Sequence, residues 1–274
     1  AFHKWGAACV ERFHGMFAFA IWDRTTGVVT LARDRLGIKP MYLAETKGAL
    51  RFASNMQALL ATGEIDSEID PVAFHHYMNF HAVVPAPRTI LKGVRKLPPA
   101  TTLTIQPDGK REERVYWAPT YATPEDERNL SFDDWKMRVL DSLRVAVRRR
   151  LVADVPVGVL LSGGVDSSLI TGLIAEETGG AGLETFSVGF ETVGNERGDE
   201  FQYSDVIAKH YDTTHHQIRV NSRDRLLPSL PSCIAAMSEP MVSHDCIGFY
   251  LLSQEVAKRV KVVQSGQGAD EVFG

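Results

Sequence analysis

Residues 157–168 read Val-Gly-Val-Leu-Leu-Ser-Gly-Gly-Val-Asp-Ser-Ser, and this stretch decides the fold. An apolar run ends in Ser162-Gly163-Gly164, and apolar positions follow with helical spacing at Leu169, Ile170, Leu173 and Ile174. The pattern predicts a strand, a glycine turn and a helix. Such a turn directs backbone N–H groups and the positive end of the helix dipole at one spot in front of the strand.

The residues of this turn suit a polyphosphate bound together with a divalent cation. Two adjacent glycines let the backbone approach an anion without interference from Cβ, and Ser162, Ser167 and Ser168 add hydroxyl donors. Asp166 lies at the mouth of the helix, where it would repel a phosphate unless a cation such as Mg²⁺ lay between them. The alternative is a strand–turn–helix connection whose glycines are purely structural, but this alternative does not explain why the turn contains so many polar residues. The turn therefore predicts a site for a nucleotide pyrophosphate and Mg²⁺.

The more common phosphate loops do not fit the sequence. No Lys follows Gly163 or Gly164, as a Gly-x-x-x-x-Gly-Lys-Ser/Thr loop requires. A second glycine pair, in residues 266–271 (Gly-Gln-Gly-Ala-Asp-Glu), lacks the third glycine of a dinucleotide-binding turn. Its Asp270 nevertheless follows an apolar run, as Asp166 does. Because the strands of a parallel sheet end at the same edge, we expect both carboxylates to face one Mg²⁺–pyrophosphate.

The composition of the 274 residues is that of an ordinary globular protein. Hydrophobic residues make up 44% and charged residues 23%, which is usual for a globular protein. The length of 274 residues suits two domains that each have a core. The net charge of −4 argues against a nucleic-acid binder, and no apolar run reaches the length of a membrane span. Cys9, Cys233 and Cys246 are far apart, which predicts reduced thiols rather than zinc ligands or disulfides. We expect a soluble, cytoplasmic protein.

The chain divides into two domains joined by a linker. Short β-type runs separated by turns fill residues 1–118, although residues 81–104, with four prolines, predict an irregular bridge. Residues 119–130 are polar and form the expected linker. Ser131 then caps a helix, and strands alternate with helices over residues 131–274. This alternation predicts a parallel α/β sheet with ligands at the carboxyl ends of its strands.

Four segments carry a resemblance to a known family. Residues 162–168 resemble the pyrophosphate loop of the ATP pyrophosphatases, which split ATP between its α and β phosphates. Residues 13–23 and 33–42 resemble the second half of a glutaminase domain, and residues 265–274 resemble the second nucleotide loop of a synthetase domain. In their order along the chain, the four segments together resemble asparagine synthetase and related glutamine-dependent amidotransferases. The implied fold is α/β, with a parallel-sheet, adenine-nucleotide-hydrolase-like synthetase domain. It is preceded by part of an antiparallel, β-rich glutaminase domain of the N-terminal-nucleophile (Ntn) type.

The resemblance also implies a reaction and a set of site residues. A carboxylate attacks ATP to give an acyl-adenylate and pyrophosphate, and ammonia from glutamine then gives an amide and AMP. Asp166 and Asp270 are the implied Mg²⁺ ligands, and the implied catalytic positions are Gln267, Asp270 and Glu271. The residues implied to bind ATP and its pyrophosphate are Leu160, Ser162, Gly163, Gly164, Asp166, Ser167, Ser168, Val188, Ser265 and Gly266.

Gln267 departs from the family pattern, which usually has Glu or Asp between the two glycines of this loop. A neutral amide is neither a base nor a counter-charge for Mg²⁺. Together with the unusual segment 238–245, Gln267 resembles the branch that amidates the dipeptide N-acetylglutaminylglutamine. Asparagine synthesis from L-aspartate is the alternative. Within that segment, Glu239 and His244 are the candidate contacts to the acceptor.

We expect the sequence to be a fragment. It begins at Ala1 rather than Met and stops at Gly274, whereas the family continues with further helices and a catalytic lysine. The family's glutaminase nucleophile is expected upstream of Ala1, so the fragment alone is expected to release no glutamate from glutamine and to be inactive as a synthetase. The expected partners are small molecules, namely ATP, glutamine or ammonia, and the carboxylate acceptor. No nucleic acid or membrane partner is expected, and a homodimer is the assembly considered.

Two other functions stay open. An enzyme of the same superfamily that thiolates tRNA or forms NAD would share the first loop only, without the glutaminase-like segments. A catalytically degenerate nucleotide-binding module is the non-enzymatic alternative, and the intact Asp166 and Asp270 argue against it.

Two pairs of neighbouring histidines, His75-His76 and His215-His216, draw attention as candidate metal ligands. Neighbouring side chains point apart in a helix or a strand, so we interpret these residues as core or surface histidines.

Overall fold

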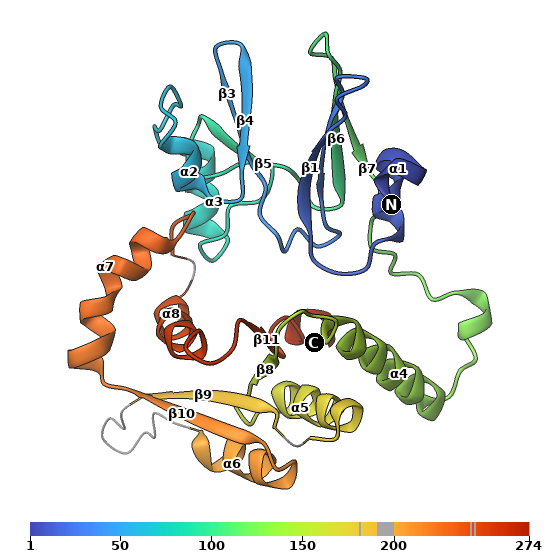
Figure 1. Ribbon diagram of the computed structural model, residues 1–274, viewed down its shortest axis with the longest axis vertical. Coiled ribbons are helices and arrows are strands. Elements are labelled where there is room, and N and C mark those ends of the chain that lie inside the picture. Colours follow the sequence, from blue (N-terminus) through green and yellow to red (C-terminus); the bar gives the residue numbers. More distant parts are fainter. Residues whose placement is uncertain (181, 191–199, 242, 244, 274) are drawn as a thin grey trace. The chain divides into compact units, whose positions relative to one another are not determined.

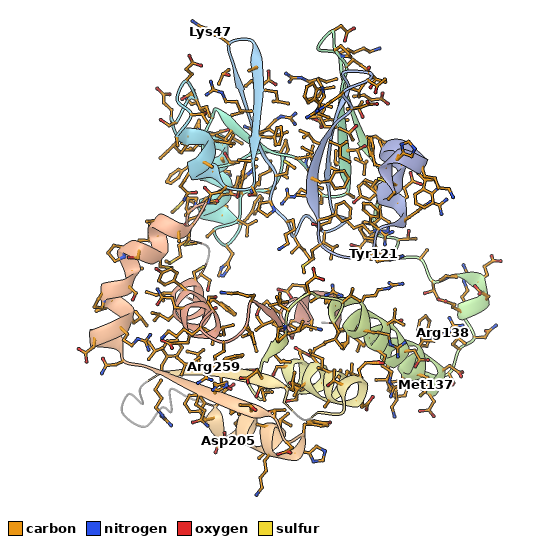
Figure 2. The ribbon with its side chains drawn as sticks, viewed as in Figure 1. Lys47, Tyr121, Met137, Arg138, Asp205 and Arg259 are labelled. Atoms are coloured by element: carbon orange, nitrogen blue, oxygen red, sulfur yellow. The ribbon has the colours of Figure 1, made fainter. Side chains whose placement is uncertain are left out.

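The structure, a computed structural model, describes residues 1–180, 182–190, 200–241, 243 and 245–273 (Figure 1). It divides into two compact units. Unit 1 comprises Ala1–Ala122 and Ala236–Ser243, and unit 2 comprises Thr123–Ala235 and His244–Gly274. The sequence does not predict that residues 236–243 group with the first unit. Side chains fill the interior of each unit (Figure 2).

Unit 1 contains two antiparallel sheets, as the pattern of short runs and turns predicts. One has the strand order β1-β2-β6-β7 and the other has the order β4-β3-β5. The strands are β1 (Ala18–Trp22), β2 (Val29–Arg33), β3 (Tyr42–Thr46), β4 (Ala49–Ala53), β5 (Val94–Lys96), β6 (Thr101–Ile105) and β7 (Arg111–Val115). The prediction of an irregular bridge over residues 81–104 is wrong at β5, where Val94 is buried and pairs with Ala44 of β3.

The core of unit 1 follows from the two-residue alternation of its strands. Leu31 and Leu103 of one sheet pack against Leu43 of the other, together with Met41 and Leu97. The residues next to them in each strand face away from the space between the two sheets. Ala32 packs on η1, a 3₁₀ segment (Gly6–Arg12), and Ala44 packs on the short helix α2 (Met56–Leu60). Helical segments therefore cover a two-sheet sandwich on both sides.

Two further helices belong to unit 1. The chain begins with the short helix α1 (Phe2–Trp5), which is followed by η1. Helix α3 (Pro71–Asn79) has Pro71 in its first turn and Asp70 as its N-cap, a combination typical of the start of a helix. The Asp70 carboxylate accepts hydrogen bonds from the N–H groups of Val72 (2.8 Å) and Ala73 (3.2 Å), which have no partner inside the helix.

The segment 33–42 is held together by its first two side chains. The buried Asp34 carboxylate accepts hydrogen bonds from four backbone N–H groups, those of Phe17 (3.3 Å), Leu36 (3.2 Å), Ile38 (3.0 Å) and Lys39 (2.9 Å). The Arg33 guanidinium donates to the backbone carbonyls of Gly37, Lys39 and Leu97. This part of the family resemblance therefore encodes a folded loop in unit 1.

Unit 2 contains a parallel sheet with the strand order β10-β9-β8-β11, which confirms the predicted fold class. Its elements are η2 (Glu125–Glu127), α4 (Phe132–Arg150), β8 (Val157–Leu160), α5 (Val165–Thr178), β9 (Glu184–Phe190), α6 (Phe201–His210), β10 (Thr214–Val220), η3 (Ser222–Leu226), α7 (Leu227–Ala236), α8 (Asp245–Val256), β11 (Val262–Gln264) and α9 (Asp270–Phe273). Ser131 caps α4 in a capping box with Asp134, as predicted for its N-terminus. Among the described residues, no helix combines the length and the apolar character needed to cross a bilayer.

Helices cover both faces of the parallel sheet. Val159 of β8 packs with Val147 of α4 and with Leu173 and Ile174 of α5. Helix α8 lies on the other face, against β9 and β10 (Figure 1). From β8 the chain runs outward to β9 and then β10, and it returns to pair β11 on the other side of β8. The junction of β8 and β11 is therefore the topological switch point, the place where open parallel sheets bind ligands.

The loop around Asp34 yields a stability prediction. Asp34→Asn keeps the shape of the side chain but removes the charge that four N–H groups share, so unit 1 should lose about 2 kcal/mol of unfolding free energy. Urea unfolding of the complete protein, followed by a signal from unit 1, measures the loss. The matched change Asp108→Asn, in an exposed turn, should cost far less. An Asp34→Asn midpoint equal to that of Asp108→Asn would contradict this account of the loop.

Candidate functional site

A cavity of about 260 Å³ lies at the carboxyl ends of β8, β9 and β11, where the topology places a ligand. Two loops line it, one after β8 and one after β11. The lining residues are Leu160, Leu161, Ser162, Gly164, Asp166, Ser167, Phe186, Ser187, Val188, Phe249, Leu252, Ser265, Gly266, Gln267, Gly268, Asp270 and Glu271. Most of the predicted site residues are therefore brought together in one place.

The first loop is braced by the hydroxyl groups of two serines. Ser162 Oγ accepts a hydrogen bond from the N–H of Gly164 (3.2 Å), and Ser167 Oγ donates to the carbonyl of Gly164 (3.2 Å). The two hydroxyls lie 3.0 Å apart, and Ser167 Oγ also accepts from the N–H of Ser162. Because the Ser167 hydroxyl donates its hydrogen bond to the carbonyl of Gly164, this side chain shapes the loop rather than offering a donor to a ligand.

Gly163 is required by the packing of the loop against helix α6. Its φ is +92°, and a Cβ at this position would lie 2.6 Å from both the backbone nitrogen of Ser204 and Cβ of Tyr203. No side chain fits there, and L-residues avoid this φ. Gly163 is not among the residues that line the cavity. Gly164 is the N-cap of α5, so the amino end of this helix opens on the cavity.

The second loop touches the first at Gly266. Strand β11 pairs in parallel with β8, so the two loops leave the same edge of the sheet side by side. A Cβ on Gly266 would lie 2.7 Å from Cβ of Asp166 and 3.0 Å from the nitrogen of Ser167. Such distances are below ordinary van der Waals contact, and only glycine permits this approach.

The cavity has an acidic side and an apolar side. Asp166, Asp270 and Glu271 contribute three carboxylates, whereas no Lys or Arg lies among the described lining residues. Phe186, Val188, Phe249 and Leu252 supply the apolar surface. In the described part of the chain, no cluster of three or more His, Cys, Asp or Glu side chains has the arrangement of a metal site. Any cation held by Asp166 and Asp270 therefore needs further ligands from water or from a bound molecule.

Three of the predicted site residues are not among those that line the cavity. Gly163 and Ser168 belong to the first loop and its helix but do not line the cavity. Glu239 belongs to unit 1. His244 lies outside the described residues. The sequence does not single out Phe186, Phe249 and Leu252, because nothing in the pattern separates their apolar side chains from those of core residues.

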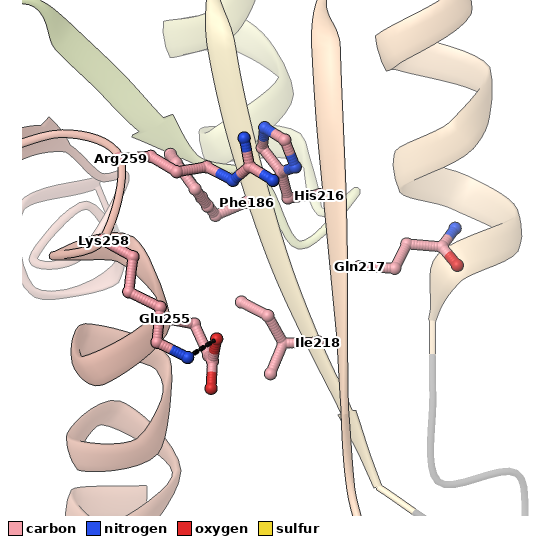
Figure 3. A pocket seen from close by; sticks show the side chains of 7 residues that line it. All are labelled: Phe186, His216, Gln217, Ile218, Glu255, Lys258 and Arg259. Carbon is pink, nitrogen blue, oxygen red and sulfur yellow. Dashed lines mark hydrogen bonds and ion pairs between the residues drawn. The ribbon is translucent and has the colours of Figure 1, made fainter.

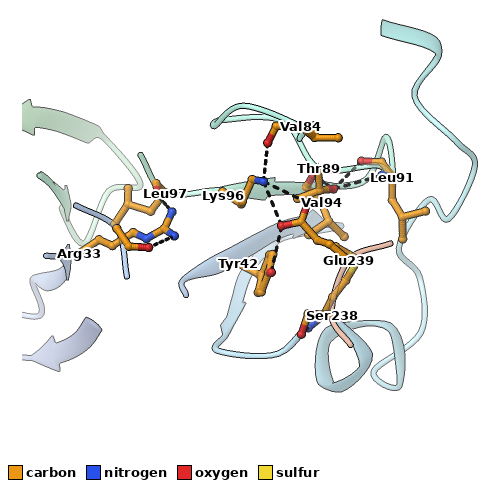
Figure 4. Close-up of polar contacts among 12 residues, drawn as sticks. Arg33, Tyr42, Val84, Thr89, Leu91, Val94, Lys96, Leu97, Ser238 and Glu239 are labelled. Carbon is orange, nitrogen blue, oxygen red and sulfur yellow. Dashed lines mark hydrogen bonds and ion pairs between the residues drawn. The ribbon is translucent and has the colours of Figure 1, made fainter. Parts of the chain in front are cut away.

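Glu239 has two partners in unit 1 (Figure 4). Its carboxylate accepts from Lys96 Nζ at 3.0 Å and from the Tyr42 hydroxyl at 3.1 Å. Lys96 also donates to the carbonyl of Val84 (2.7 Å). Burial, followed by the charge of Glu239, raises the pKa of Tyr42 far above its ordinary value, so this hydroxyl is a donor at neutral pH. These contacts anchor segment 236–243, and the role of Glu239 toward an acceptor stays a prediction.

A second cavity of about 370 Å³ lies beside β9, β10 and the end of α8 (Figure 3). It contains none of the predicted site residues. Its polar groups are largely paired, because Lys258 contacts Glu255 (2.6 Å) and His216 contacts Glu184 (2.5 Å). The ring of Phe186 stacks on His216 and lines both cavities. Phe186 therefore lies between the two cavities.

Comparison with known proteins identifies both parts of the chain. Residues 138–274 match the family model described as asparagine synthase, and residues 1–117 match the model of a glutamine amidotransferase domain. "Putative asparagine synthetase (glutamine-hydrolyzing)" of Mycobacterium tuberculosis H37Rv is 34% identical over the whole chain, which covers 41% of that protein. "Putative asparagine synthetase (glutamine-hydrolyzing) 2" of Methanocaldococcus jannaschii is 34% identical over the whole chain, which covers 52% of it. "Asparagine synthetase (glutamine-hydrolyzing) 1" of Bacillus subtilis is 34% identical over 96% of the chain, which covers 40% of it. The chain thus spans between two fifths and about one half of the length of these relatives.

The contact at Gly266 yields a prediction for the site. Gly266→Ala forces the two loops apart, and the affinity of the complete protein for ATP in the presence of Mg²⁺ should fall by about ten-fold or more, which is ~1.4 kcal/mol. Isothermal titration measures the change. Gly248→Ala, on helix α8, is the matched control, because among the described residues the added methyl group meets the ring of Phe190 alone, at 3.2 Å. Equal affinities of the Gly266→Ala and Gly248→Ala variants would show that the loops do not need this contact.

Proposed function

Since the chain belongs to the asparagine synthase family, we propose that the protein transfers nitrogen from glutamine to a carboxylate at the expense of ATP. ATP is cleaved between its α and β phosphates, so that the carboxylate becomes an acyl-adenylate before it is amidated. Unit 1 corresponds to the glutamine-using part of such an enzyme and unit 2 to the synthetase part.

One observation carries this proposal, namely the composition of the cavity at the switch point. It joins an apolar surface to three carboxylates and to the amino end of helix α5. Adenosine suits the apolar side, which includes Phe186, Val188 and Phe249. The polyphosphate suits the amide groups after β8, where the helix dipole also favours an anion.

The same cavity fits a divalent cation that arrives with the nucleotide. Mg²⁺ is usually held by one or two carboxylates together with phosphate oxygens and water, rather than by a full set of protein ligands. Asp166 and Asp270 are the two carboxylates that would hold it, since their loops touch at Gly266 and both line the cavity. When bound, the cation offsets the charge that develops on the departing pyrophosphate.

The proposed chemistry has two balanced steps. An oxygen of the acceptor carboxylate attacks the α phosphorus, and the bond from that phosphorus to the bridging oxygen breaks and releases pyrophosphate. The nitrogen of ammonia then attacks the acyl carbon, loses a proton and displaces AMP. The residues of the first loop, from Ser162 to Gly164, position the β and γ phosphates for the first step.

For the acceptor we propose N-acetylglutaminylglutamine, with L-aspartate as the second candidate. The reason is Gln267, which lines the cavity with a neutral amide between Gly266 and Gly268. An amide offers both a donor and an acceptor but no charge, which suits an acceptor with amide groups of its own.

The test of the proposed function is pyrophosphate release by the complete protein. With Mg²⁺, ATP and ammonia present, we expect release that depends on N-acetylglutaminylglutamine. Release with L-aspartate alone would assign asparagine synthesis instead. Binding of ATP without release for either acceptor would contradict the proposal and favour a nucleotide-binding module that has lost its catalysis.

The two proposed Mg²⁺ ligands give a further prediction. Asp166→Asn and Asp270→Asn should each raise the Mg²⁺ concentration needed for half-maximal pyrophosphate release by about ten-fold or more, because a carboxylate that binds the cation becomes a neutral amide. Asp141→Asn is the control, since this exposed carboxylate on α4 has Arg144, at 3.4 Å, as its one polar contact among the described residues. An unchanged Mg²⁺ requirement in both loop variants would rule these residues out as ligands.

A further inference from the structure

We infer that His215 is a positioning residue for the loop after β8, and that its imidazole acts as a neutral, Nε2-protonated hydrogen-bonding bridge. The inference rests on the proposed function only for the identity of the molecule that the loop binds. Of the residues that line the cavity, Ser187 contacts this ring.

His215 lies within a cluster of hydroxyl groups on the α6 face of the sheet. It is the second residue of β10 and pairs in register with Thr185 of β9. Its side chain is only 10% exposed. Nδ1 lies 2.9 Å from Oγ1 of Thr185, and Nε2 lies 3.2 Å from Oγ of Ser187 and 3.3 Å from Oγ of Ser204. The three hydroxyl-bearing residues around the ring are all buried.

The carbonyl groups around these serines decide which ring nitrogen carries the proton. Ser187 Oγ donates its proton to the carbonyl of Leu161, and Ser204 Oγ donates to the carbonyl of Phe201 (3.2 Å). A carbonyl oxygen only accepts, so neither serine has a second proton to offer to the ring. Nε2 must therefore be the donor, with its proton shared between the two serine oxygens.

The other ring nitrogen completes a consistent chain of donors. Nδ1 carries no proton in the neutral Nε2–H form, so it accepts from the hydroxyl of Thr185. The oxygen of Thr185 in turn accepts from the hydroxyl of Thr213, which is 2.8 Å away. A positively charged ring would place a second donor against Thr185 and reverse this chain.

The charged groups near the ring agree with a neutral imidazole. Burial lowers the pKa of His215 below its ordinary value, and this effect outweighs the opposing charge of Asp205. The Asp205 carboxylate lies 3.9 Å from Nε2 but is 57% exposed to solvent at the surface of α6 (Figure 2). The neighbouring His216 also disfavours a charge on His215.

The two serines connect the ring to both supports of the loop. Leu161 is the last residue before the loop, and its N–H and C=O are both held by β9, through the carbonyl of Phe186 (2.8 Å) and the hydroxyl of Ser187. Ser204 belongs to the first turns of α6, whose backbone packs directly on Gly163. A single imidazole N–H thus ties the strand before the loop to the helix beneath it.

The test compares two substitutions of His215 in the complete protein. His215→Leu removes the donor and breaks both hydrogen bonds to the serines, so the KM for ATP in pyrophosphate release should rise by about ten-fold. His215→Gln keeps an N–H near the position of Nε2 and should stay within about three-fold of the original value. His210→Leu, at an exposed histidine of α6, is the matched control and should change nothing. A KM that does not rise in His215→Leu, or a rise as large in His215→Gln or His210→Leu, would overturn the inference.

Two further measurements separate this inference from folding defects and from the proposed function. If His215→Leu does not fold, Ser187→Ala keeps the imidazole but removes the hydroxyl that links it to the Leu161 carbonyl, and the KM for ATP should rise in the same direction. Nitrogen NMR of the histidines tests the ring in the absence of any nucleotide. A protonated Nε2 and a bare Nδ1 at pH 7.5 are expected for His215, and a protonated Nδ1 would overturn the inference even if the proposed function holds. An inactive protein with the expected NMR signature would contradict the proposed function alone.

Discussion

The contact between Gly266 and the first turn of α5 is the constraint on which the candidate site depends. Two loops that are about 100 residues apart in sequence meet with no room for a single methyl group, because β11 pairs with β8 in parallel. This contact brings Asp166 and Asp270 to the same cavity, although neither carboxylate belongs to a metal cluster of its own in the described part of the chain. The glycine on the other side of the first loop, Gly163, has the same kind of role toward α6. Backbone contacts thus set how closely the two loops approach, and the hydroxyl groups of Ser162 and Ser167 brace the first loop.

Unit 1 uses charged side chains for a different purpose. Arg33 and Asp34 satisfy the backbone groups of one loop, and Lys96 and Tyr42 hold the carboxylate of Glu239. Buried charges of this kind are retained only where hydrogen bonds compensate for the lost hydration. The motif around Asp34 carries much of the resemblance to the family, yet its role in this structure is to fold a loop. A motif that identifies a family can therefore consist of residues that fold a loop.

The sequence predicts those features that depend on local geometry. The cap at Asp70, the cap at Ser131 and the turn after β8 each follow from a few neighbouring residues, and the structure contains all three. Contacts between distant segments are not encoded locally. The apolar wall of Phe186 and Phe249, the packing role of Gly163 and the grouping of residues 236–243 with unit 1 all depend on which elements meet in space. His215 illustrates the same limit, since a histidine beside three hydroxyl groups looks like any other strand residue until β9 and α6 are placed around it.

The central claim is that the two loops form one site that activates a carboxylate by cleaving ATP at its α phosphate. Exchange of labelled pyrophosphate into ATP tests it most directly, because the reverse of the first step needs no ammonia and no turnover. With the complete protein, Mg²⁺ and the acceptor, the account predicts that label enters ATP, and that none enters when the acceptor is omitted. Exchange of labelled phosphate instead of pyrophosphate, or no exchange with an acceptor that is amidated, would contradict the claim.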